Sequence, residues 1–265
     1  MNPHATIGVD VGGTTIKAGL VDLRTGKLVG EAVHAPTPRG GAPVHVVDTI
    51  AGCVQLLDPA GEHQQIGVCL PSVVSKGVTL SAANMDPGWI GFDATTHLSN
   101  ELNRTAVAMN DADAAGYAET RYGAAKGEGG LVILVTLGTG IGTALIHNGT
   151  LIPNSELGHL EINGIDWESK ASSVARERLG LSWVAWAGNL QIYLDALERL
   201  MSPDLIVIGG GISSTPEKFL PLIDCTAPVV PAQLGFAAGI SGAAAFSGLQ
   251  GHDQYATTAG AAFWR

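Results

Sequence analysis

The chain has 265 residues, 46% of them hydrophobic and 14% charged, so it can bury a sizeable core and disorder is not expected. Its 14 Lys and Arg residues are outnumbered by 24 Asp and Glu, and the formal charge of -10 disfavours a nucleic-acid-binding protein. No apolar run reaches membrane-spanning length and the first residues lack a signal-peptide pattern, so we expect a cytoplasmic protein that does not contact membranes.

The first half opens with two strands joined by a glycine turn. Alternating apolar residues predict a strand over 6–11, Gly12 and Gly13 form the turn, and a second β-rich run covers 15–23. A third strand is expected over 28–34. Further along, apolar periodicity predicts a helix over 44–57, strands over 65–70 and 105–109, and a helix over 112–122.

The second half repeats this opening pattern. A strand over 130–137, a turn at residues 138–140 and a returning strand over 141–147 resemble the first hairpin in order and spacing. We therefore expect a duplicated hairpin, one in each of two lobes, with the turns facing each other across a cleft. The remaining expected elements are a long helix over 181–201, a buried strand over 205–208 and a tight turn at Gly209–Gly211.

The first glycine turn has the chemistry of a phosphate-binding loop. Its glycines allow backbone amides to form a nest for phosphate oxygens, and threonine hydroxyls add donors. An aspartate at the strand end can hold hydrated Mg²⁺ beside those phosphates, and a lysine on the returning strand adds a cation. The alternative is an ordinary hairpin whose aspartate caps the turn. The candidate donor-binding residues here are Asp10, Gly12, Gly13, Thr14, Thr15 and Lys17.

The second glycine turn offers another set of amides, so the two nests together can hold a chain of phosphates between the lobes. Gly138, Thr139 and Gly140 are the candidates in this turn. Gly210 joins them, because the backbone at Gly209–Gly211 must turn tightly or approach something closely.

Asn110 and Asp111 follow a predicted strand at its carboxyl end, where open α/β sheets place their ligands. Asp111 can accept the proton of a sugar hydroxyl as that oxygen attacks phosphorus, while Asn110 hydrogen-bonds the sugar. The alternative is that either residue simply caps the following helix. Asp113 is the local competitor for the role of base.

Glu156-Leu-Gly-His159 brings a carboxylate and an imidazole together, and Glu168 follows. Polar planar side chains of this kind pair with adjacent sugar hydroxyls, so a hexose is the expected ligand. Taken singly, each residue is more typical of solvated surface or of a hydrogen-bonded structural position.

These motifs together resemble the ROK family of bacterial sugar kinases and repressors over nearly the whole chain, and the run from Thr136 to Glu161 is similar to the family members that use polyphosphate to phosphorylate glucose. The resemblance implies an α/β, actin-like (ribonuclease H-like) fold, with an amino-terminal lobe at 1–109 and a carboxyl-terminal lobe at 110–265. It implies Mg²⁺, polyphosphate or ATP as the phosphoryl donor, and glucose or mannose as the acceptor.

The resemblance also assigns roles to individual residues. Asp111 is implied as the base that deprotonates the 6-hydroxyl, and Asp10 as the residue that holds Mg²⁺ through water. The implied sugar-binding residues are Asn84, Asn110, Asp111, Glu156, His159 and Glu168.

Two departures from the family pattern matter. Many members carry a cysteine zinc site after the histidine, but the eight residues between His159 and Glu168 include no cysteine, so we expect no structural zinc. Cys53, Cys69 and Cys225 are isolated and are expected to be buried thiols. Ser72 stands where relatives often have glycine, and its hydroxyl is a candidate for relaxed selectivity toward mannose.

Two other functions are compatible with the same fold: a sugar-responsive regulator and a non-catalytic actin-like switch. The first strand is predicted to begin at Thr6, so we expect no DNA-binding domain ahead of it, and a switch needs no base beside a sugar site. A monomer or a homodimer is expected. A polyphosphate donor also needs cations beyond the glycine turns, and the candidates in the first half are Lys17, Arg39, Lys76, Arg104, Arg121 and Lys126.

Overall fold

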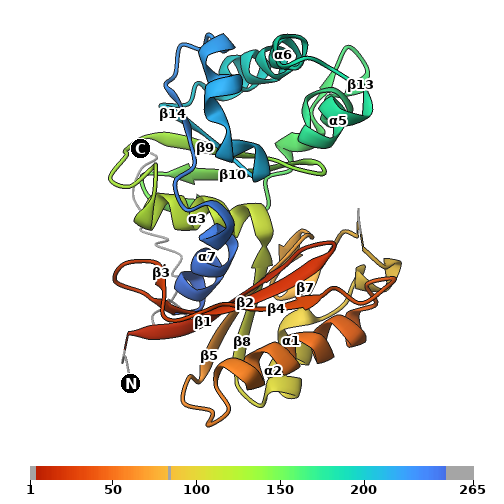
Figure 1. The fold of residues 1–265 in the computed structure, drawn as a ribbon, viewed down its shortest axis with the longest axis vertical. Coiled ribbons are helices and arrows are strands. Elements are labelled where there is room, and N and C mark those ends of the chain that lie inside the picture. The colour runs from red at the N-terminus through yellow and green to blue at the C-terminus, as the bar shows by residue number, and fades with distance from the viewer. Residues whose placement is uncertain (1–3, 83–84, 249–265) are drawn as a thin grey trace, which may run out of the picture.

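The computed structural model describes residues 4–82 and 85–248, and these form two lobes, each built on one sheet (Figure 1). In the first sheet the strand order is β3-β2-β1-β5-β8, with β4 also paired to β2. β1 and β2 are antiparallel, whereas β1, β5 and β8 are parallel. The strands are β1 (Ala5–Val11), β2 (Thr15–Asp22), β3 (Lys27–Leu28), β4 (Val33–Pro36), β5 (Gln65–Leu70) and β8 (Thr105–Asn110).

The second sheet repeats this topology in the order β11-β10-β9-β14-β15. β9 and β10 form an antiparallel hairpin, and β14 and β15 continue the sheet parallel to β9. The strands are β9 (Leu131–Leu137), β10 (Ile141–His147), β11 (Thr150–Ile152), β14 (Leu205–Gly209) and β15 (Val229–Pro231). The duplicated hairpin predicted from the two glycine turns is therefore confirmed.

Each lobe has its own apolar core between its sheet and its outer helices. In the first lobe, Ile50 and Leu98 from the helices pack with Ile66 on the sheet. In the second, Trp186 and Leu190 pack on the other sheet. The helices concerned are α1 (Pro43–Leu57), α2 (Ala94–Leu102) and α6 (Trp183–Met201), the last capped by the Ser182 side chain.

Two helices pack against each other between the sheets. α3 (Asp111–Tyr122) packs on β9 and β10, whereas α7 (Ala238–Ser247) packs on β1 and β5. Glycine permits this close approach: a Cβ at Gly67 would overlap the carbonyl of Ala243, and one at Gly242 would overlap that of Ala114. α7 thus returns from the second half of the chain to the first sheet, and the division at 109 and 110 stays a prediction.

The strand predicted over 28–34 is wrong in extent. The chain leaves the sheet after β3 and re-enters it at β4, because Gly30 adopts φ +83° and breaks the extended run. Short elements complete the described chain: β6 (Val74–Ser75), β7 (Val78–Thr79), β12 (Glu161–Ile162), β13 (Ile165–Asp166), α4 (Glu168–Ala171), α5 (Ser173–Arg178) and the 3₁₀ turns η1 (Pro87–Trp89), η2 (Leu157–His159), η3 (Gly211–Ser214), η4 (Pro216–Lys218), η5 (Leu220–Leu222) and η6 (Gly235–Ala237).

None of the helices in the described ranges combines the length and the apolar character needed to cross a membrane. The three cysteines are free. Cys53 and Cys69 are buried as expected, whereas Cys225 is partly exposed.

Candidate active site

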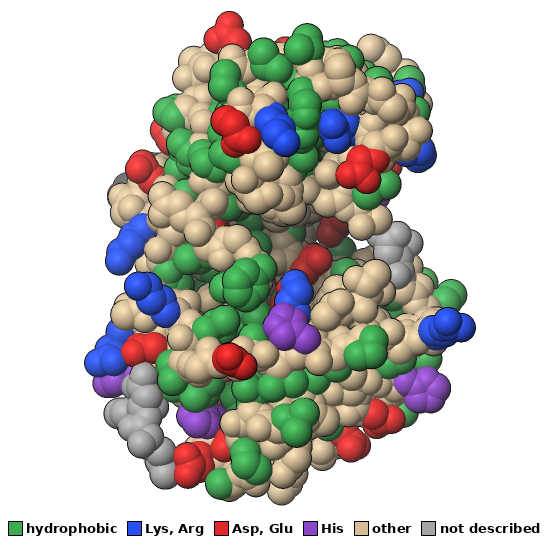
Figure 2. All heavy atoms as spheres, in the orientation of Figure 1, with side chains coloured by type: hydrophobic (Ala, Val, Ile, Leu, Met, Phe, Trp, Pro, Cys, Tyr) green, Lys and Arg blue, Asp and Glu red, His purple; other side chains and the backbone are tan. Residues whose placement is uncertain are grey.

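A cleft separates the two lobes, and acidic and basic side chains are visible inside it (Figure 2). The first glycine turn joins β1 to β2 and is closed by a hydrogen bond from Gly12 N to Thr15 O of 3.0 Å. Thr37 steadies the turn from β4's end, donating through Oγ1 to Gly12 O at 2.6 Å. Gly13 and Thr14 are exposed, and a Cβ at Gly13 would meet open space. The amides of this turn are therefore accessible to a ligand.

Asp10 lies where β1 meets this turn and is held on both oxygens. Lys17 Nζ is 3.1 Å from Oδ2, and Cys69 Sγ donates to Oδ1 at 3.5 Å. Gly239 in the first turn of α7 approaches from the other side, because a Cβ there would lie 2.9 Å from Asp10 Cγ. The sequence predicts only a core thiol at Cys69 and carries no signal for Gly239, because neither contact is visible in a local pattern.

The second glycine turn joins β9 to β10 and is supported by Glu168. The amide of Ile141 donates to Glu168 Oε2 at 2.9 Å, and a Cβ at Gly140 would overlap that carboxylate. Gly210 lies beneath the turn: it has φ +79°, and a Cβ would lie 2.5 Å from Leu137 O. Glu168 and Gly210 thus support the shape of this loop, and Thr139 at its tip is exposed.

Asp111 begins α3, and its carboxyl group has a strongly perturbed acidity. Its pKa is raised to about 7, first by burial and then by the negative charge of Asp10, with a smaller contribution from Glu156. The backbone amide of Ala112 donates a hydrogen bond to Asp111 Oδ1 at 2.8 Å, which stabilises the ionised carboxylate and partly offsets the rise in pKa. Asp10 and the start of α3 lie at the same edge of the first sheet, because Asp10 pairs with Cys69 and Cys69 with Met109. The start of α3 also abuts the strand after the second glycine turn, since a Cβ at Gly142 would lie 2.9 Å from Ala112 Cβ. A carboxyl group poised near neutral pH suits a general base.

Asn110 is the amino-terminal cap of α3. Its Oδ1 accepts from Asp113 N at 3.0 Å, and its Nδ2 donates to Ser72 O at 3.2 Å. The capping alternative is therefore correct for Asn110, although the second hydrogen of its amide has no described partner and can still face a ligand.

Asn154 connects the two lobes and is not among the residues predicted from the sequence. Its side chain pairs with the backbone of Val74 in the first lobe like a neighbouring strand, accepting from Val74 N and donating to Val74 O, both at 2.9 Å. Its own amide donates to Asp113 Oδ2 at 2.7 Å. The φ of +63° at Asn154 suits asparagine, and Glu156 follows two residues later. This network fixes the segment that carries Glu156 relative to the start of α3.

Asp113 is almost fully buried at 1% exposure, and its pKa is also raised to about 7 by burial. Its Oδ2 is used by Asn154, and its Oδ1 has no hydrogen-bond partner among the described residues. Asp113 therefore serves the connection between the lobes, whereas Asp111 keeps some exposure to solvent.

His159 and Glu156 are exposed on the segment after β11. His159 Nδ1 lies 2.9 Å from Asp166 Oδ2, and this hydrogen bond is the main reason that the pKa of His159 is raised. The pKa of Glu156 is raised by partial desolvation of its carboxyl group, against the opposing charge of His159. Asp166 orients the imidazole and was not singled out from the sequence. Asn84 lies outside the described residues.

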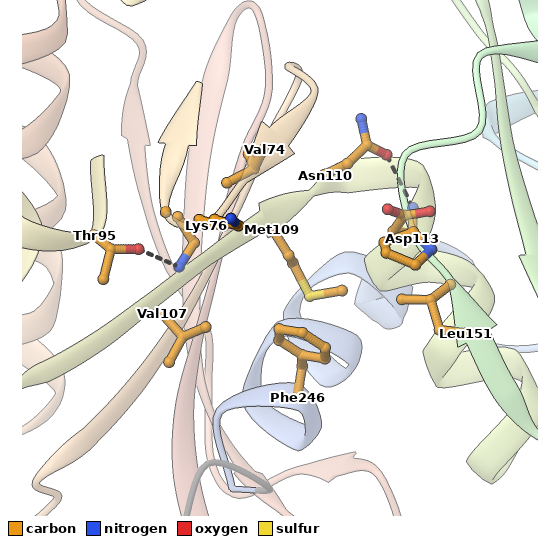
Figure 3. A pocket seen from close by; sticks show the side chains of 12 residues that line it. Val74, Lys76, Thr95, Val107, Met109, Asn110, Asp113, Leu151 and Phe246 are labelled. Carbon is orange, nitrogen blue, oxygen red and sulfur yellow. Dashed lines mark hydrogen bonds between the residues drawn. The ribbon is translucent and has the colours of Figure 1, made fainter. Parts of the chain in front are cut away.

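A pocket of about 620 Å³ lies beside this cleft but is chemically different from it. Figure 3 shows Met109 and Phe246 in its middle, with Asn110 and Asp113 at one end and Thr95 at the other. Neither glycine turn nor the candidate base lines it. Its lining is mainly apolar, and its polar side chains are Lys76, Thr95, Asn110 and Asp113.

Two sheets of matching topology, each presenting a glycine hairpin at a shared cleft, define the actin-like ATPase fold. Comparison with known proteins narrows this class. The family model described as ROK family matches residues 6–171. A polyphosphate glucokinase from Mycobacterium tuberculosis is 48% identical over 238 residues, which cover 89% of this chain and 89% of that protein.

Two solved structures are similar over nearly the whole chain. The inorganic polyphosphate/ATP-glucomannokinase from Arthrobacter sp. strain KM gives a TM-score of 0.89 at 48% identity, with 93% of this chain and 99% of that chain covered. A ROK family glucokinase from Streptomyces griseus, in complex with glucose and AMPPNP, gives 0.80 at 26% identity, with coverage of 92% and 99%. The chain belongs to the ROK family, and the resemblance seen in the sequence is confirmed.

Proposed function

We propose that this protein transfers the terminal phosphoryl group of inorganic polyphosphate or ATP to the 6-hydroxyl of glucose, with mannose as a second acceptor. The observation that carries the proposal is the position of Asp111 at the start of α3. Asp10 of the first glycine turn lies at the same sheet edge, and Gly142, just after the second turn, packs against the neighbouring Ala112. The pKa of Asp111, raised to about 7, suits a base at this place. The 48% identity to a polyphosphate glucokinase supports a kinase rather than a regulator or a switch.

In the proposed reaction, Asp111 accepts the proton of the sugar hydroxyl while that oxygen forms its bond to the terminal phosphorus. The bond between this phosphorus and its bridging oxygen breaks, and the electrons leave with ADP or with the shortened polyphosphate. The protein forms no covalent intermediate. Positioning of sugar and donor, and exclusion of water as the lobes close, supply most of the acceleration.

The residues around Asp10 fit a divalent cation held through water. Its carboxylate oxygens are hard ligands, and the repulsion between Asp10 and Asp111 that raises the pKa of Asp111 is what a nearby cation would relieve. When bound, Mg²⁺ would neutralise charge on the donor phosphates. Lys17, paired with Asp10, holds this carboxylate in place. We expect no structural zinc, since no cysteine follows His159 at ligand spacing.

The sugar is proposed to lie between the start of α3 and the segment 154–159. The Glu156 carboxylate accepts hydrogen bonds from the sugar hydroxyls, and the His159 imidazole, oriented by Asp166, also hydrogen-bonds them. One carboxylate oxygen of Glu168 accepts from the second glycine turn. Its other oxygen is proposed to bind the sugar, so that Glu168 links the sugar site to the donor site. Asn84 and the free hydrogen of the Asn110 amide complete the proposed set. The three free cysteines fit a reducing compartment, which supports the cytoplasm.

A direct assay tests the proposal. Purified protein is supplied with Mg²⁺, glucose or mannose, and either ATP or polyphosphate, and the 6-phosphate product is measured. We expect glucose 6-phosphate with both donors and a slower reaction with mannose. Absence of sugar phosphate with every combination would refute the proposed function.

A further inference from the structure

Two cationic side chains converge on one indole ring in the second lobe. The guanidinium Cζ of Arg176 lies 3.8 Å from the centroid of Trp183, and the ammonium of Lys218 lies 5.4 Å from it. The indole is itself held in place, since it stacks on Phe219 at 6.4 Å with 16° between the planes. We call Arg176, Trp183 and Lys218 the Trp183 cluster. The stacked indole therefore holds both cationic groups near one ring.

Neither cation of the Trp183 cluster has a carboxylate partner among the residues that the structure describes. The ion pairs within 4–82 and 85–248 involve Lys17, Arg24, Arg104 and two histidines. The Nε of Arg176 is buried without a described hydrogen-bond partner. Glu177 and Glu217 are neighbours in sequence but form no ion pair with the cluster there. An anion that contacts both cations would be stabilised by each of them.

The cluster is built on segments that also abut the second glycine turn. Val174, two residues before Arg176, donates its amide to Gly138 O at 3.1 Å. The segment that carries Lys218 starts at Gly210, where a Cβ would lie 2.5 Å from Leu137 O. Both cations are therefore carried by backbone segments that contact the second glycine turn.

The basic residues of the second lobe fall mainly on three short elements. Five Lys or Arg residues lie between 131 and 247, and four of them belong to α4, α5 and η4. Two of the cations expected from the first half are committed elsewhere: Arg104 forms a buried pair with Asp58 at 2.9 Å, and Arg121 donates to Tyr117 Oη. The Trp183 cluster is therefore a candidate continuation from the second glycine turn.

We propose that the Trp183 cluster binds the distal phosphates of a linear inorganic polyphosphate whose terminal phosphoryl group lies at the glycine turns. This rests on the proposed kinase function. Polyphosphate repeats a negative charge along its length, which matches a guanidinium fork and an ammonium held on a rigid ring. Tripolyphosphate and ATP have no phosphates beyond the third, so they do not depend on the cluster.

The test is the double variant Arg176→Gln/Lys218→Gln, assayed with long-chain polyphosphate, tripolyphosphate and ATP at saturating glucose and Mg²⁺. The variant loses charge-assisted contacts, so we expect the KM for long-chain polyphosphate to rise roughly tenfold. The kcat values and the KM values for tripolyphosphate and ATP stay as in the wild type. The dependence of the long-chain KM on salt also becomes less steep.

The matched control is Lys27→Gln/Arg199→Gln, which removes the same charge from two exposed positions outside the cluster. Arg176→Lys keeps the charge and should recover part of the affinity, while unchanged ATP turnover shows that the variants fold. An unchanged long-chain KM, a rise equal to that of the control, or a rise for ATP as well would overturn the assignment. If the wild type uses ATP but not polyphosphate, the proposed donor itself fails.

Discussion

Replacing Asp111 with asparagine tests the proposed base through two independent quantities. The variant keeps the size and the cap geometry of the start of α3 but cannot accept a proton from the sugar. General-base assistance is worth about 10² to 10⁴ in rate, so we expect kcat to fall by that factor. The KM for glucose should change little, because the amide oxygen can still accept a hydrogen bond from the 6-hydroxyl.

The same variant should be more stable than the wild type at high pH. The pKa of Asp111 is raised from 3.8 to about 7. At about 1.4 kcal/mol per pKa unit this corresponds to ~4 kcal/mol, and the partial exposure of the side chain reduces the expected gain to about half. In the window between these two values the folded wild type binds a proton that the unfolded chain has lost, so wild-type stability falls as pH rises through it. The advantage of the variant is therefore larger at pH 8 than at pH 5.

Asp113→Asn is the matched control, because Asp113 shares the raised pKa of about 7 and lies two residues away. It should show a similar pH-dependent change in the free energy of unfolding, measured by denaturant titration, with most of the turnover retained. Near-wild-type turnover in Asp111→Asn together with loss of turnover in Asp113→Asn would refute the assignment of the base.

Three further predictions follow from the same geometry. The kcat/KM for glucose of the wild type should fall as pH drops below about 7, because Asp111 must be ionised; a flat profile between pH 5 and 8 would contradict this. Asn154→Gly keeps the φ of +63° but removes the pairing to Val74, so KM for glucose should rise more than kcat falls; equal effects on both would show a purely structural role. Gly239→Ala places a Cβ 2.9 Å from Asp10 Cγ and should lower kcat, whereas Gly188→Ala in α6, where a Cβ meets open space, should stabilise the fold by ~0.5–1 kcal/mol; unchanged kcat in Gly239→Ala would contradict the position given to Asp10.

The two hairpins and the start of α3 could be predicted from the sequence because their signals are local. Glycine turns between β-rich runs and a cap before a helix each depend on a few consecutive residues. The duplication then placed the turns on opposite lobes, and the carboxyl end of β8 gave the position of Asp111.

The supporting contacts of the site could not be predicted, since they join residues far apart in the chain. Asn154 pairs with Val74 across 80 positions, and Cys69 reaches Gly239 O across 170. The extent of one strand was misjudged at Gly30, where a single left-handed residue ends an otherwise β-like pattern. Pairing across the sheets, rather than propensity, decides such features.

The most direct test of the central claim is a crystal structure of the protein with glucose and a non-hydrolysable ATP analogue. We predict that a carboxylate oxygen of Asp111 lies within hydrogen-bond distance of glucose O6, roughly 2.6–3.2 Å, with the terminal phosphate held by amides of both glycine turns. A sugar bound with its 6-hydroxyl directed away from Asp111, or a phosphate chain remote from the two turns, would contradict the account.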